Sequence, residues 1–456
     1  MNNSIQNKQL QLIPIVAAIS FFMASLDGTA VNTIIPYLAT VFHSPLSTTK
    51  NIIIFYMIAN SLFIPLTGIL CQKYSCRIIF CIALIVFTFG SLLCGISQTL
   101  NQLLAARIIQ GIGGALMLPV GRLAVIQTFP KDQLIKALGM VTIPGLTGPL
   151  IGPIVGGIIA SYMHWSVIFL INIPFGIAGI YFALRFFPTT TDKKIKIDFW
   201  GYLLFAVSIA LMTYALSLFS ESQDYTRPAI ILLIGLLLSG VYWVRSFFHD
   251  HPLFNPKLFK IRSFSVGIIG NLVARLGCGA VPFMIPLMLQ QLMGLSPVAC
   301  GMAMIPLALS SIIAKPFVAK AIRFAGYRNF LFINTLILSA SYVSYSFVDE
   351  HSTWTLLVIL MLITGFVNSM QFTAMNTATV LDLSPKRQPA GSCLLSTVMQ
   401  VSMASGVAVA AILLTLDEKI HIHALPASHF HFTWIWLGGF TTISAFIFLL
   451  LPNKRI

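Results

Sequence analysis

One carboxyl group of this sequence falls inside a long apolar run. Asp27 lies within residues 12–36, and of the twelve Asp and Glu residues it alone falls inside a predicted membrane-crossing segment. A charged carboxylate is unfavourable in hydrocarbon, so an ionisable residue kept there is expected to be functional. Burial favours the neutral carboxyl and a nearby cation favours the charged one, so a small movement of Asp27 relative to a cation would bind or release a proton. The alternative is a structural partner for an arginine.

Arg107 is the cation whose predicted depth matches that of Asp27. Asp27 lies 15 residues beyond Leu12 on a helix that runs outward, which is about 22 Å at ~1.5 Å per residue. Arg107 lies 7 residues beyond Leu100 on a helix that runs inward, about 20 Å above the inner face of a ~30 Å hydrocarbon core. We therefore expect Arg107 to tune proton binding at Asp27. The alternative is that Arg107 only holds helices together.

Arg275 is a second arginine in an apolar run, and the neighbouring spans offer it no acidic residue. It lies 11 residues from Phe264, or ~16 Å deep. An unpaired cation at this depth should face water or bind an anion, and a backbone carbonyl partner is the alternative. Polar side chains of other runs are candidate walls of a cavity that also holds Arg275. They are Asn32, Asn368, Gln371, Asn376 and Gln400.

The composition of the chain indicates the solvent around these groups. Of its 456 residues, 57% are hydrophobic and only 9% are charged, against roughly 25% charged in soluble domains. Lipid is therefore the expected solvent for much of the chain. The net charge of +15 comes from basic residues spread over short loops, which does not indicate nucleic-acid binding. The seven cysteines include no C-x-x-C pair, so no disulfide framework, metal site or cofactor is expected.

Fourteen apolar runs are long enough to cross a bilayer. Each can satisfy its backbone hydrogen bonds only as a helix, which predicts an all-α polytopic membrane protein. If the N-terminus is cytoplasmic, inside segments hold 21 Lys and Arg residues and outside loops hold 3, as the positive-inside rule requires. Both termini are therefore expected in the cytoplasm. The runs are 12–36, 50–71, 78–97, 100–127, 134–162, 166–186, 199–218, 228–248, 264–292, 298–322, 329–348, 353–380, 387–416 and 432–452.

The sequence repeats itself weakly across its two halves. Leu26–Pro36 and Leu276–Pro286 match at 5 of 11 positions with an offset of 250. Ser75-Cys76-Arg77 resembles Gly326-Tyr327-Arg328 with an offset of 251. Parallel repeats of this kind place a solute site near the midplane, where the halves meet. The predicted parts are an N-terminal six-helix bundle over 1–190, a two-helix insert with its linkers over 191–262, and a C-terminal six-helix bundle over 263–456.

Several motifs are similar to those of one family of membrane proteins. They are L-D-G-T-A-V-N-T-I-I-P (Leu26–Pro36), W-S-V-I-F-L-I-N-I-P-F-G (Trp165–Gly176), I-D-F-W-G-Y-L-L, A-R-L-G-C-G-A-V-P-F-M-I-P and V-N-S-M-Q-F-T-A-M-N-T. With these motifs the chain resembles the major facilitator superfamily. Within it, the chain resembles the fourteen-span drug:proton antiporter branch of the EmrB/QacA type, and most of all the MdtD-type multidrug transporters. The resemblance implies the major facilitator fold, in which the first and fourth spans are neighbours.

Two motifs bear on proton coupling and on the direction of solute transport. R-I-I-Q-G-I-G-G (Arg107–Gly114) is similar to the family motif linked with proton transfer. Small residues four apart let helices approach closely, and proline bends a helix. A glycine-rich string of this kind in the fifth predicted span resembles the antiporter motif of exporters and favours export over uptake. Its residues are Gly148, Gly152, Pro153, Gly156 and Gly157.

The segment Gly68–Arg77 occupies the place of the family's loop motif after the second span. Gln72 stands where the family has an acidic residue, and Ser75 stands where it has a glycine. Lys73 and Arg77 keep the basic residues of the motif. The family's acid helps to lock the inner gate by charge contacts, so Gln72 predicts a neutral hydrogen bond in place of that latch.

The last external loop contains two histidine pairs. His421-Ile422-His423 and His429-Phe430-His431 have a spacing that could ligate zinc, nickel or copper. The alternative is a solvated polar loop, because no cysteine or acidic pair completes a site. The sequence therefore predicts no bound metal.

Together these residues predict a secondary carrier that couples inward proton flow to outward solute movement across the bacterial inner membrane. Because Arg107 and Arg275 outweigh Asp27, we hypothesise a preference for anionic or zwitterionic solutes such as hydroxycarboxylates or siderophore and metal chelates. The expected partners are membrane lipid, protons and the solute, and a periplasmic adaptor is left open. The alternatives are an uptake carrier for such a chelate and a transport-inactive membrane receptor. A membrane enzyme is the weakest alternative, because no catalytic constellation is present.

Overall fold

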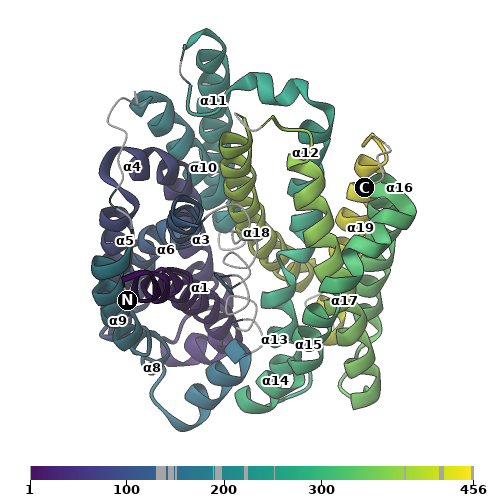
Figure 1. The fold of residues 1–456 in the computed structure, drawn as a ribbon. Helices are drawn as coiled ribbons and strands as arrows, with labels where there is room; N and C mark the ends of the chain where they lie inside the picture. The colour runs from purple at the N-terminus through teal and green to yellow at the C-terminus, as the bar shows by residue number, and fades with distance from the viewer. Residues whose placement is uncertain are drawn as a thin grey trace. The chain divides into compact units, whose positions relative to one another are not determined.

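The described part of the chain is built of helices. The computed structural model describes residues 2–129, 140–141, 148, 151–187, 189, 198–219, 224–250, 252–384, 387–420 and 426–452. None of these residues forms a β-strand, and the elements are helices joined by short connections (Figure 1). The predicted all-α class is therefore confirmed.

The helices follow the apolar runs of the sequence, because a helix satisfies every backbone hydrogen bond within its own segment. They are α1 (Asn2–Val41), α2 (Leu46–Thr49), α3 (Asn51–Phe63), α4 (Thr67–Tyr74), α5 (Cys76–Gly95), α6 (Leu100–Thr128), α8 (Val167–Leu170), α9 (Asn172–Phe186), α10 (Phe199–Phe219), α11 (Thr226–Phe248), α12 (Arg262–Cys278), α13 (Val281–Gln291), α14 (Pro297–Ala303), α15 (Ile305–Ile313), α16 (Lys315–Ser344), α17 (Trp354–Val380), α18 (Gln388–Ile420) and α19 (Pro426–Phe448). Short 3₁₀ turns lie at Ile64–Leu66, Pro256–Lys260 and Tyr345–Phe347.

Twelve helical segments of the described ranges are long and apolar enough to cross a membrane. Two further apolar helices are shorter, Ile151–Tyr162 and Pro297–Ile313. They fall in the fifth and tenth predicted spans. The fifth span, 134–162, lies partly outside the described residues, and the helix Ile151–Tyr162 forms its end.

The tenth predicted span, 298–322, is not one continuous helix. It is divided among α14, α15 and the beginning of α16. Each of these helices has a proline in its first turn, where the missing N–H is tolerated but the preceding hydrogen-bond ladder is interrupted. The prolines are Pro297, Pro306 and Pro316.

Residue contacts divide the chain into two compact units, Met1–Ile197 and Asp198–Ile456. In the first unit, α6 packs against α1, α3 and α5, and α9 packs against α1 and α5. The core of this unit is apolar, and the rings of Phe80 and Phe187 stack there with centroids 4.4 Å apart. Because α6 contacts three other helices, its side chains can meet groups from each of them.

The second unit contains the two helices of the predicted insert. In it, α12 packs against α17, α18 and α19, and α16 packs against α17 and α19. The insert helices α10 and α11 pair with each other, and α10 also packs against α18. The insert therefore shares its described contacts with the helices that follow it in the sequence.

A bidentate ion pair joins the start of α10 to the end of α11. Asp198 accepts hydrogen bonds from both terminal nitrogens of Arg245, at 2.9 and 2.8 Å, and from the Gly201 backbone N–H at 3.0 Å. Burial by itself would raise the pKa of Asp198, but these hydrogen bonds and the Arg245 charge outweigh it, so the pKa lies below its usual value. The pair is therefore maintained at neutral pH and is weakened as acid protonates Asp198.

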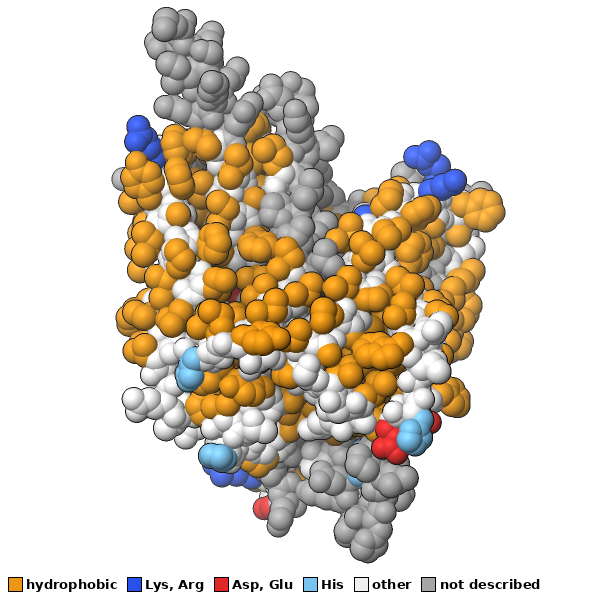
Figure 2. Space-filling model, turned by 90° about the horizontal axis from the view of Figure 1, so that it is seen from below, with side chains coloured by type: hydrophobic (Ala, Val, Ile, Leu, Met, Phe, Trp, Pro, Cys, Tyr) orange, Lys and Arg blue, Asp and Glu red, His pale blue; other side chains and the backbone are white. Residues whose placement is uncertain are grey.

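The helices carry apolar side chains on both faces. On α5, Phe80, Ala83 and Phe87 are fully buried, whereas Ile78, Ile82, Ile85, Phe89 and Leu92 form a stripe in which each residue is 40–53% exposed. Hydrophobic side chains also cover most of the face in Figure 2, and the charged side chains in view lie mainly at its edges. An apolar surface of this extent is stable in lipid and not in water. The protein is therefore a multi-pass membrane protein.

The repeated tripeptides adopt the same unusual backbone conformation in the two units. Ser75, between α4 and α5, has φ 72° and ψ 151°, and Gly326, inside the kinked α16, has φ 74° and ψ 161°. Positive φ with extended ψ is a region occupied almost only by glycine. Gly326 therefore fits its turn, whereas Ser75 is strained, and its hydroxyl gives only a long N-cap contact of 3.5 Å to the Ile78 N–H.

We expect Ser75→Gly to stabilise the protein by about 1 kcal/mol, because it removes the strain at positive φ and sacrifices only a weak cap. Gly326→Ala should destabilise the protein by about 1–3 kcal/mol for the opposite reason. Thermal unfolding of the purified protein in detergent would measure both changes. A lower unfolding temperature for Ser75→Gly would contradict the assignment of strain.

Candidate functional site

Asp27 and Arg107 form a buried ion pair. Arg107 Nη1 on α6 lies 2.6 Å from Asp27 Oδ2 on α1, and each residue is 1% exposed. Charges at this depth are held only when they are paired and hydrogen-bonded, and removing one partner of such a pair typically costs about 3–5 kcal/mol. Both charges therefore depend on one another and on the polar groups around them.

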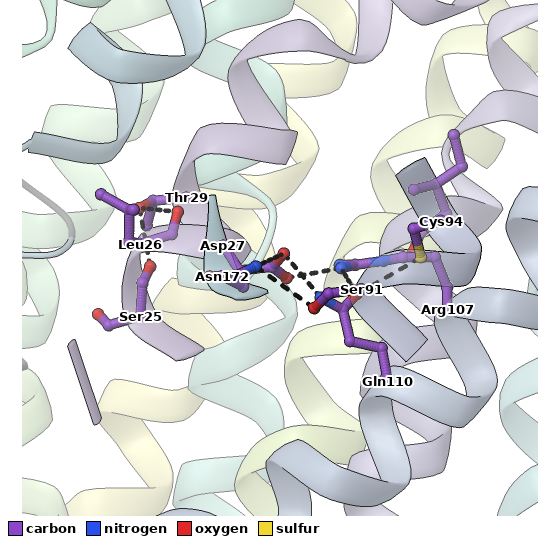
Figure 3. Close-up of polar contacts among 10 residues, drawn as sticks. Ser25, Leu26, Asp27, Thr29, Ser91, Cys94, Arg107, Gln110 and Asn172 are labelled. Carbon is purple, nitrogen blue, oxygen red and sulfur yellow. Dashed lines mark hydrogen bonds and ion pairs between the residues drawn. The ribbon is translucent and has the colours of Figure 1, made fainter. Parts of the chain in front are cut away.

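Three neutral side chains complete the surroundings of Asp27 (Figure 3). Gln110 Nε2 on α6 donates to Asp27 Oδ1 at 3.0 Å, and Asn172 Nδ2 at the start of α9 donates to the same oxygen at 3.3 Å. Both amides also donate to Ser91 Oγ on α5, at 2.8 and 3.5 Å. Side chains of α6 and α9 thus meet at the carboxylate on α1, and Ser91 of α5 joins the two amides. We call Asp27, Ser91, Arg107, Gln110 and Asn172 the Asp27 cluster.

Arg107 is held by more than its ion pair. Its Nε donates to the backbone oxygen of Ile52 at 3.1 Å, and its Nη1 donates to Gln110 Oε1 at 2.5 Å. The guanidinium also lies 4.3 Å from the centre of the Tyr56 ring and 5.6 Å from that of Phe169. Neutral acceptors and ring faces therefore stabilise the cation in addition to its ion pair with Asp27.

Glycines let the helices approach closely enough to build this cluster. A Cβ at Gly111 would lie 2.6 Å from the Tyr56 backbone oxygen, and a Cβ at Gly113 would lie 2.4 Å from the Phe87 backbone nitrogen. Arg107 and Gln110 lie one turn apart on α6 and share a face of the helix. In R-I-I-Q-G-I-G-G, the polar residues therefore bind Asp27, and the glycines allow α3 and α5 to pack against α6.

The glycines of the predicted antiporter motif pack against the turn of α1 that carries Asp27. A Cβ at Gly148 would lie 2.6 Å from Ser25 Cβ, one at Gly152 would lie 2.0 Å from Thr29 Oγ1, and one at Gly156 would lie 2.6 Å from the Ala30 backbone oxygen. The Thr29 hydroxyl also donates to the Gly148 oxygen at 3.2 Å. This contact leaves no room for larger side chains beside Asp27.

The structure describes the other residues predicted to act in gating less fully. Pro153 and Gly157 are buried within the helix Ile151–Tyr162. Arg77 Nε donates to the Phe187 backbone oxygen at the end of α9, at 2.7 Å. Gly68 and Gln72 lie in α4, and the side chain of Gln72 is outside what the structure describes, so the neutral latch predicted at Gln72 stays a prediction.

Arg275 is fully buried in the second unit. Its Nε donates to Asn271 Oδ1 at 3.3 Å, its Nη2 donates to Asn376 Oδ1 at 3.1 Å, and its guanidinium lies 4.2 Å from the centre of the Phe372 ring. Its Nη1 has no hydrogen-bond partner among the described residues. Neutral amides therefore surround this cation without cancelling its charge.

The other polar residues predicted to line a cavity have different surroundings. Gln371 is fully buried and bridges helices, because it accepts from Asn334 at 2.9 Å and donates to Thr335 at 2.7 Å. Asn32 Oδ1 and Asn368 Oδ1 are buried without a hydrogen-bond partner among the described residues. Gln400 is half-buried on α18.

Asp417 corrects the expectation that Asp27 alone among the acidic residues lies inside a span. The helix α18 continues to Ile420, beyond the predicted end at 416, because no helix-breaking residue follows position 416 directly. Asp417 is 2% exposed, and its Oδ2 lies 2.6 Å from His429 Nδ1 on α19.

His431, in the second histidine pair, lies with its Nε2 3.1 Å from the Val348 oxygen. His421 and His423 lie outside the described residues, and no metal-binding group of three or more His, Cys, Asp or Glu side chains occurs in the described ranges.

Sequence reasoning assigned no role to Ser91, Gln110 or Asn172. Gln110 lies within the motif that begins at Arg107, and Asn172 lies within W-S-V-I-F-L-I-N-I-P-F-G. Both motifs can be recognised in the sequence. Only the packing of α6 and α9 against α1, however, shows that the two amides bind the same carboxylate. Ser91 carries no signal in the sequence that separates it from other serines in apolar runs.

The helices of spanning length and the buried ion pair define a multi-pass membrane protein with a charged interior, and comparison with known proteins places it in a family of transporters. The sequence model of the Major Facilitator Superfamily matches residues 17–270 and 267–455, so the chain belongs to this superfamily of transporters. It is similar to MdtD, named as a candidate multidrug resistance protein, of Escherichia coli O6:H1, with 38% identity over 96% of this chain and 94% of the relative. A MdtD of Shigella flexneri is also 38% identical, over 96% of this chain and 94% of its own length.

Solved structures support the same fold. A peptide transporter POT crystallised with sulfate superposes with a TM-score of 0.71 at 13% identity, covering 96% of this chain and 93% of its own. The nucleoside transporter NupG superposes with a TM-score of 0.69 at 13% identity, covering 97% of this chain and 99% of its own. At such identities the likeness concerns the fold alone.

Gly156→Ala should destabilise the protein by about 1–3 kcal/mol, because the added methyl group would meet the α1 backbone beside Asp27. Gly240→Ala on α11 is the matched control, because a Cβ there has no atom within 4 Å. Thermal unfolding of the purified variants would compare the two. Equal unfolding temperatures would show that the glycine contact with α1 is not tight.

Proposed function

We propose that this protein is a proton-coupled secondary exporter of small molecules, of the multidrug-efflux type. The observation that carries the proposal is the fully enclosed Asp27–Arg107 pair, on a stretch of α1 that packs through Thr29 and Ala30 against glycines of the helix Ile151–Tyr162. A carboxyl group that is buried beside a cation is suited to bind and release a proton. The kinship with MdtD, whose name refers to multidrug resistance, supports the choice of efflux.

In the proposed mechanism, ionised Asp27 holds α1 against α6 through Arg107. Proton binding removes the negative charge and weakens this attraction, while Arg107 keeps the Ile52 oxygen, Gln110 and the Tyr56 ring as partners. The α1 helix can then move relative to α6, and the smooth glycine surface at Gly152 and Gly156 permits sliding without side-chain clashes. Release of the proton on the other side restores the pair and completes the alternating-access cycle.

The proposal includes a topology. The chain would have fourteen spans, with residues 1–190 and 263–456 as the two bundles and 191–262 as the insert. An even number of spans places both termini on the same side of the membrane, here the cytoplasm of a bacterium. The bias of 21 to 3 in basic residues between inside and outside loops supports this orientation. Protons then enter from the outer side of the inner membrane and are exchanged for solute.

Asp27→Asn should abolish uphill solute transport, because a permanently neutral side chain cannot carry a proton. Proteoliposomes of known orientation with an imposed pH gradient, tested with a panel that includes citrate and tetraphenylphosphonium, would measure accumulation. We expect only equilibration in the variant and full accumulation with the control Asp224→Asn, whose carboxylate is exposed in a loop. Undiminished accumulation by Asp27→Asn would overturn the mechanism. Flux in the same direction as the proton would instead indicate an uptake carrier, and no flux with any solute would favour a receptor.

We further propose that the solute is anionic or zwitterionic, for example a hydroxycarboxylate or a metal chelate. Arg275 supports this class, because its guanidinium has neutral amide partners and one nitrogen without a hydrogen bond among the described residues. A buried cation in this condition is stabilised by an anion. Asn376 would position the guanidinium, and Asn368 and Gln400 are the proposed polar walls of the second unit.

Arg275→Gln should weaken the binding of a carboxylate solute roughly 10- to 100-fold, as expected for the loss of a charge-assisted hydrogen bond of about 1.5–3 kcal/mol. Arg275→Lys keeps the charge and should lose less. Binding of citrate and of tetraphenylphosphonium to the purified protein, measured by calorimetry, would separate the effects. Tight cation binding that is unaffected by Arg275→Gln would contradict the anionic preference.

A further inference from the structure

The hydrogen bonds around Asp27 fit only its ionised form. Asp27 Oδ2 accepts from Arg107 Nη1, and Asp27 Oδ1 accepts from Gln110 Nε2 and from Asn172 Nδ2. All three contacts bring an N–H group to a carboxylate oxygen. A protonated carboxyl group would carry an O–H donor and would need an acceptor in the same buried space.

The acceptors of the Asp27 cluster are almost all occupied. Gln110 Oε1 accepts from Arg107 Nη1 at 2.5 Å and from Cys94 Sγ at 3.7 Å, which uses both of its lone pairs. Ser91 Oγ accepts from Gln110 and from Asn172. Arg107 has no acceptor atom. Asn172 Oδ1 is the exception, because it is buried and has no hydrogen-bond partner among the described residues.

We propose that Asn172 is a positioning residue that serves both protonation states of Asp27 by rotating its amide. With Asp27 ionised, Nδ2 faces the carboxylate and donates. With Asp27 protonated, the amide turns by about half a rotation, and Oδ1 accepts the new O–H group in the place where Nδ2 stood. This proposal rests on the proposed function, in which Asp27 carries the proton.

The amide suits this role because its other contact, with Ser91 Oγ, is long at 3.5 Å, and a hydroxyl group can accept from Nδ2 or donate to Oδ1. Asn172 is 1% exposed, so water does not compete for either end of the amide. In the orientation described, Nδ2 has hydrogen-bond partners and Oδ1 has none among the described residues. Rotation of the amide would place Oδ1 toward Asp27 and Nδ2 away from it. The proton on Asp27 therefore decides which end faces the carboxyl group, since an unsatisfied buried polar contact costs about 1–3 kcal/mol.

Other titratable groups near Asp27 cannot replace this acceptor. Among the described residues, Arg107 on α6, Tyr56 on α3 and Cys94 on α5 are the charged or titratable side chains that interact with the Asp27 carboxylate. Arg107 is a donor only, and the Tyr56 ring stacks on Arg107. Cys94 already donates to Gln110. The helix Ile151–Tyr162 meets the same turn of α1 through glycines.

Infrared difference spectra of the purified protein between high and low pH would test this role directly. The carbonyl stretch of protonated Asp27 is identified as the band that Asp27→Asn removes. Asn172→Val and Asn172→Leu take away the acceptor, so the band should move to higher wavenumber as the O–H group loses its hydrogen bond. Asn172→Thr, a close match in shape to Asn172→Val, keeps an acceptor and should leave the band near its native position.

A second measurement needs no substitution at position 172. With asparagine labelled by ¹³C at the side-chain carbonyl, the native protein should show an amide band that shifts to lower wavenumber on acidification, as Oδ1 gains a hydrogen bond. An Asp27 band that is equal in the native protein and all Asn172 variants, or an unchanged amide band, would overturn the role of Asn172 and leave proton binding at Asp27 intact. Absence of any Asp27-dependent band would overturn both this inference and the proposed function.

Discussion

The buried contact between the Asp27 carboxylate and the Arg107 guanidinium is the interaction on which the first unit depends. Two opposite charges are removed from water, and each is unfavourable there without the other. The surrounding helices are arranged to satisfy them, with the Ile52 oxygen, Gln110 and Asn172 supplying the remaining hydrogen bonds. The glycines of α6 and of the helix Ile151–Tyr162 serve the same end, because side chains larger than hydrogen would hold the backbones too far apart.

The two units have diverged at related positions of the repeat. At the offset of 250, Asp27 corresponds to Gly277. A Cβ at Gly277 would lie 2.1 Å from Thr441 Oγ1 and 2.9 Å from the Leu437 oxygen on α19, so this position packs helices together and carries no charge. The buried charge of α12 is instead Arg275, two residues earlier, and its hydrogen-bond partners are amides. Among the described residues, one unit thus holds a compensated ion pair, and the other holds a buried cation whose hydrogen-bond partners are neutral amides.

Exposed and buried side chains of the helices differ in polarity, because lipid and the protein interior offer different hydrogen-bond partners. The exposed stripe of α5 is apolar, since lipid offers no hydrogen bonds. Buried polar groups depend instead on one another for hydrogen bonds. Twelve buried side-chain polar atoms of the described residues have no hydrogen-bond partner, among them Arg275 Nη1, Asn172 Oδ1 and Asn368 Oδ1, and each calls for an explanation.

The sequence by itself determined the class of the protein, because composition and the length of the apolar runs leave helices in lipid as the stable solution. It also identified Asp27 and Arg107, since a charge in an apolar run is conspicuous, and the repeat that relates Ser75 to Gly326. It did not predict that prolines divide the tenth span into separate helices or that Asp417 is buried. Only the tertiary structure brought Gln110 and Asn172 to the same carboxylate and Ser91 to both amides. Neutral polar side chains are common in membrane helices, and their partners lie on helices distant in sequence, so packing alone decides which of them meet.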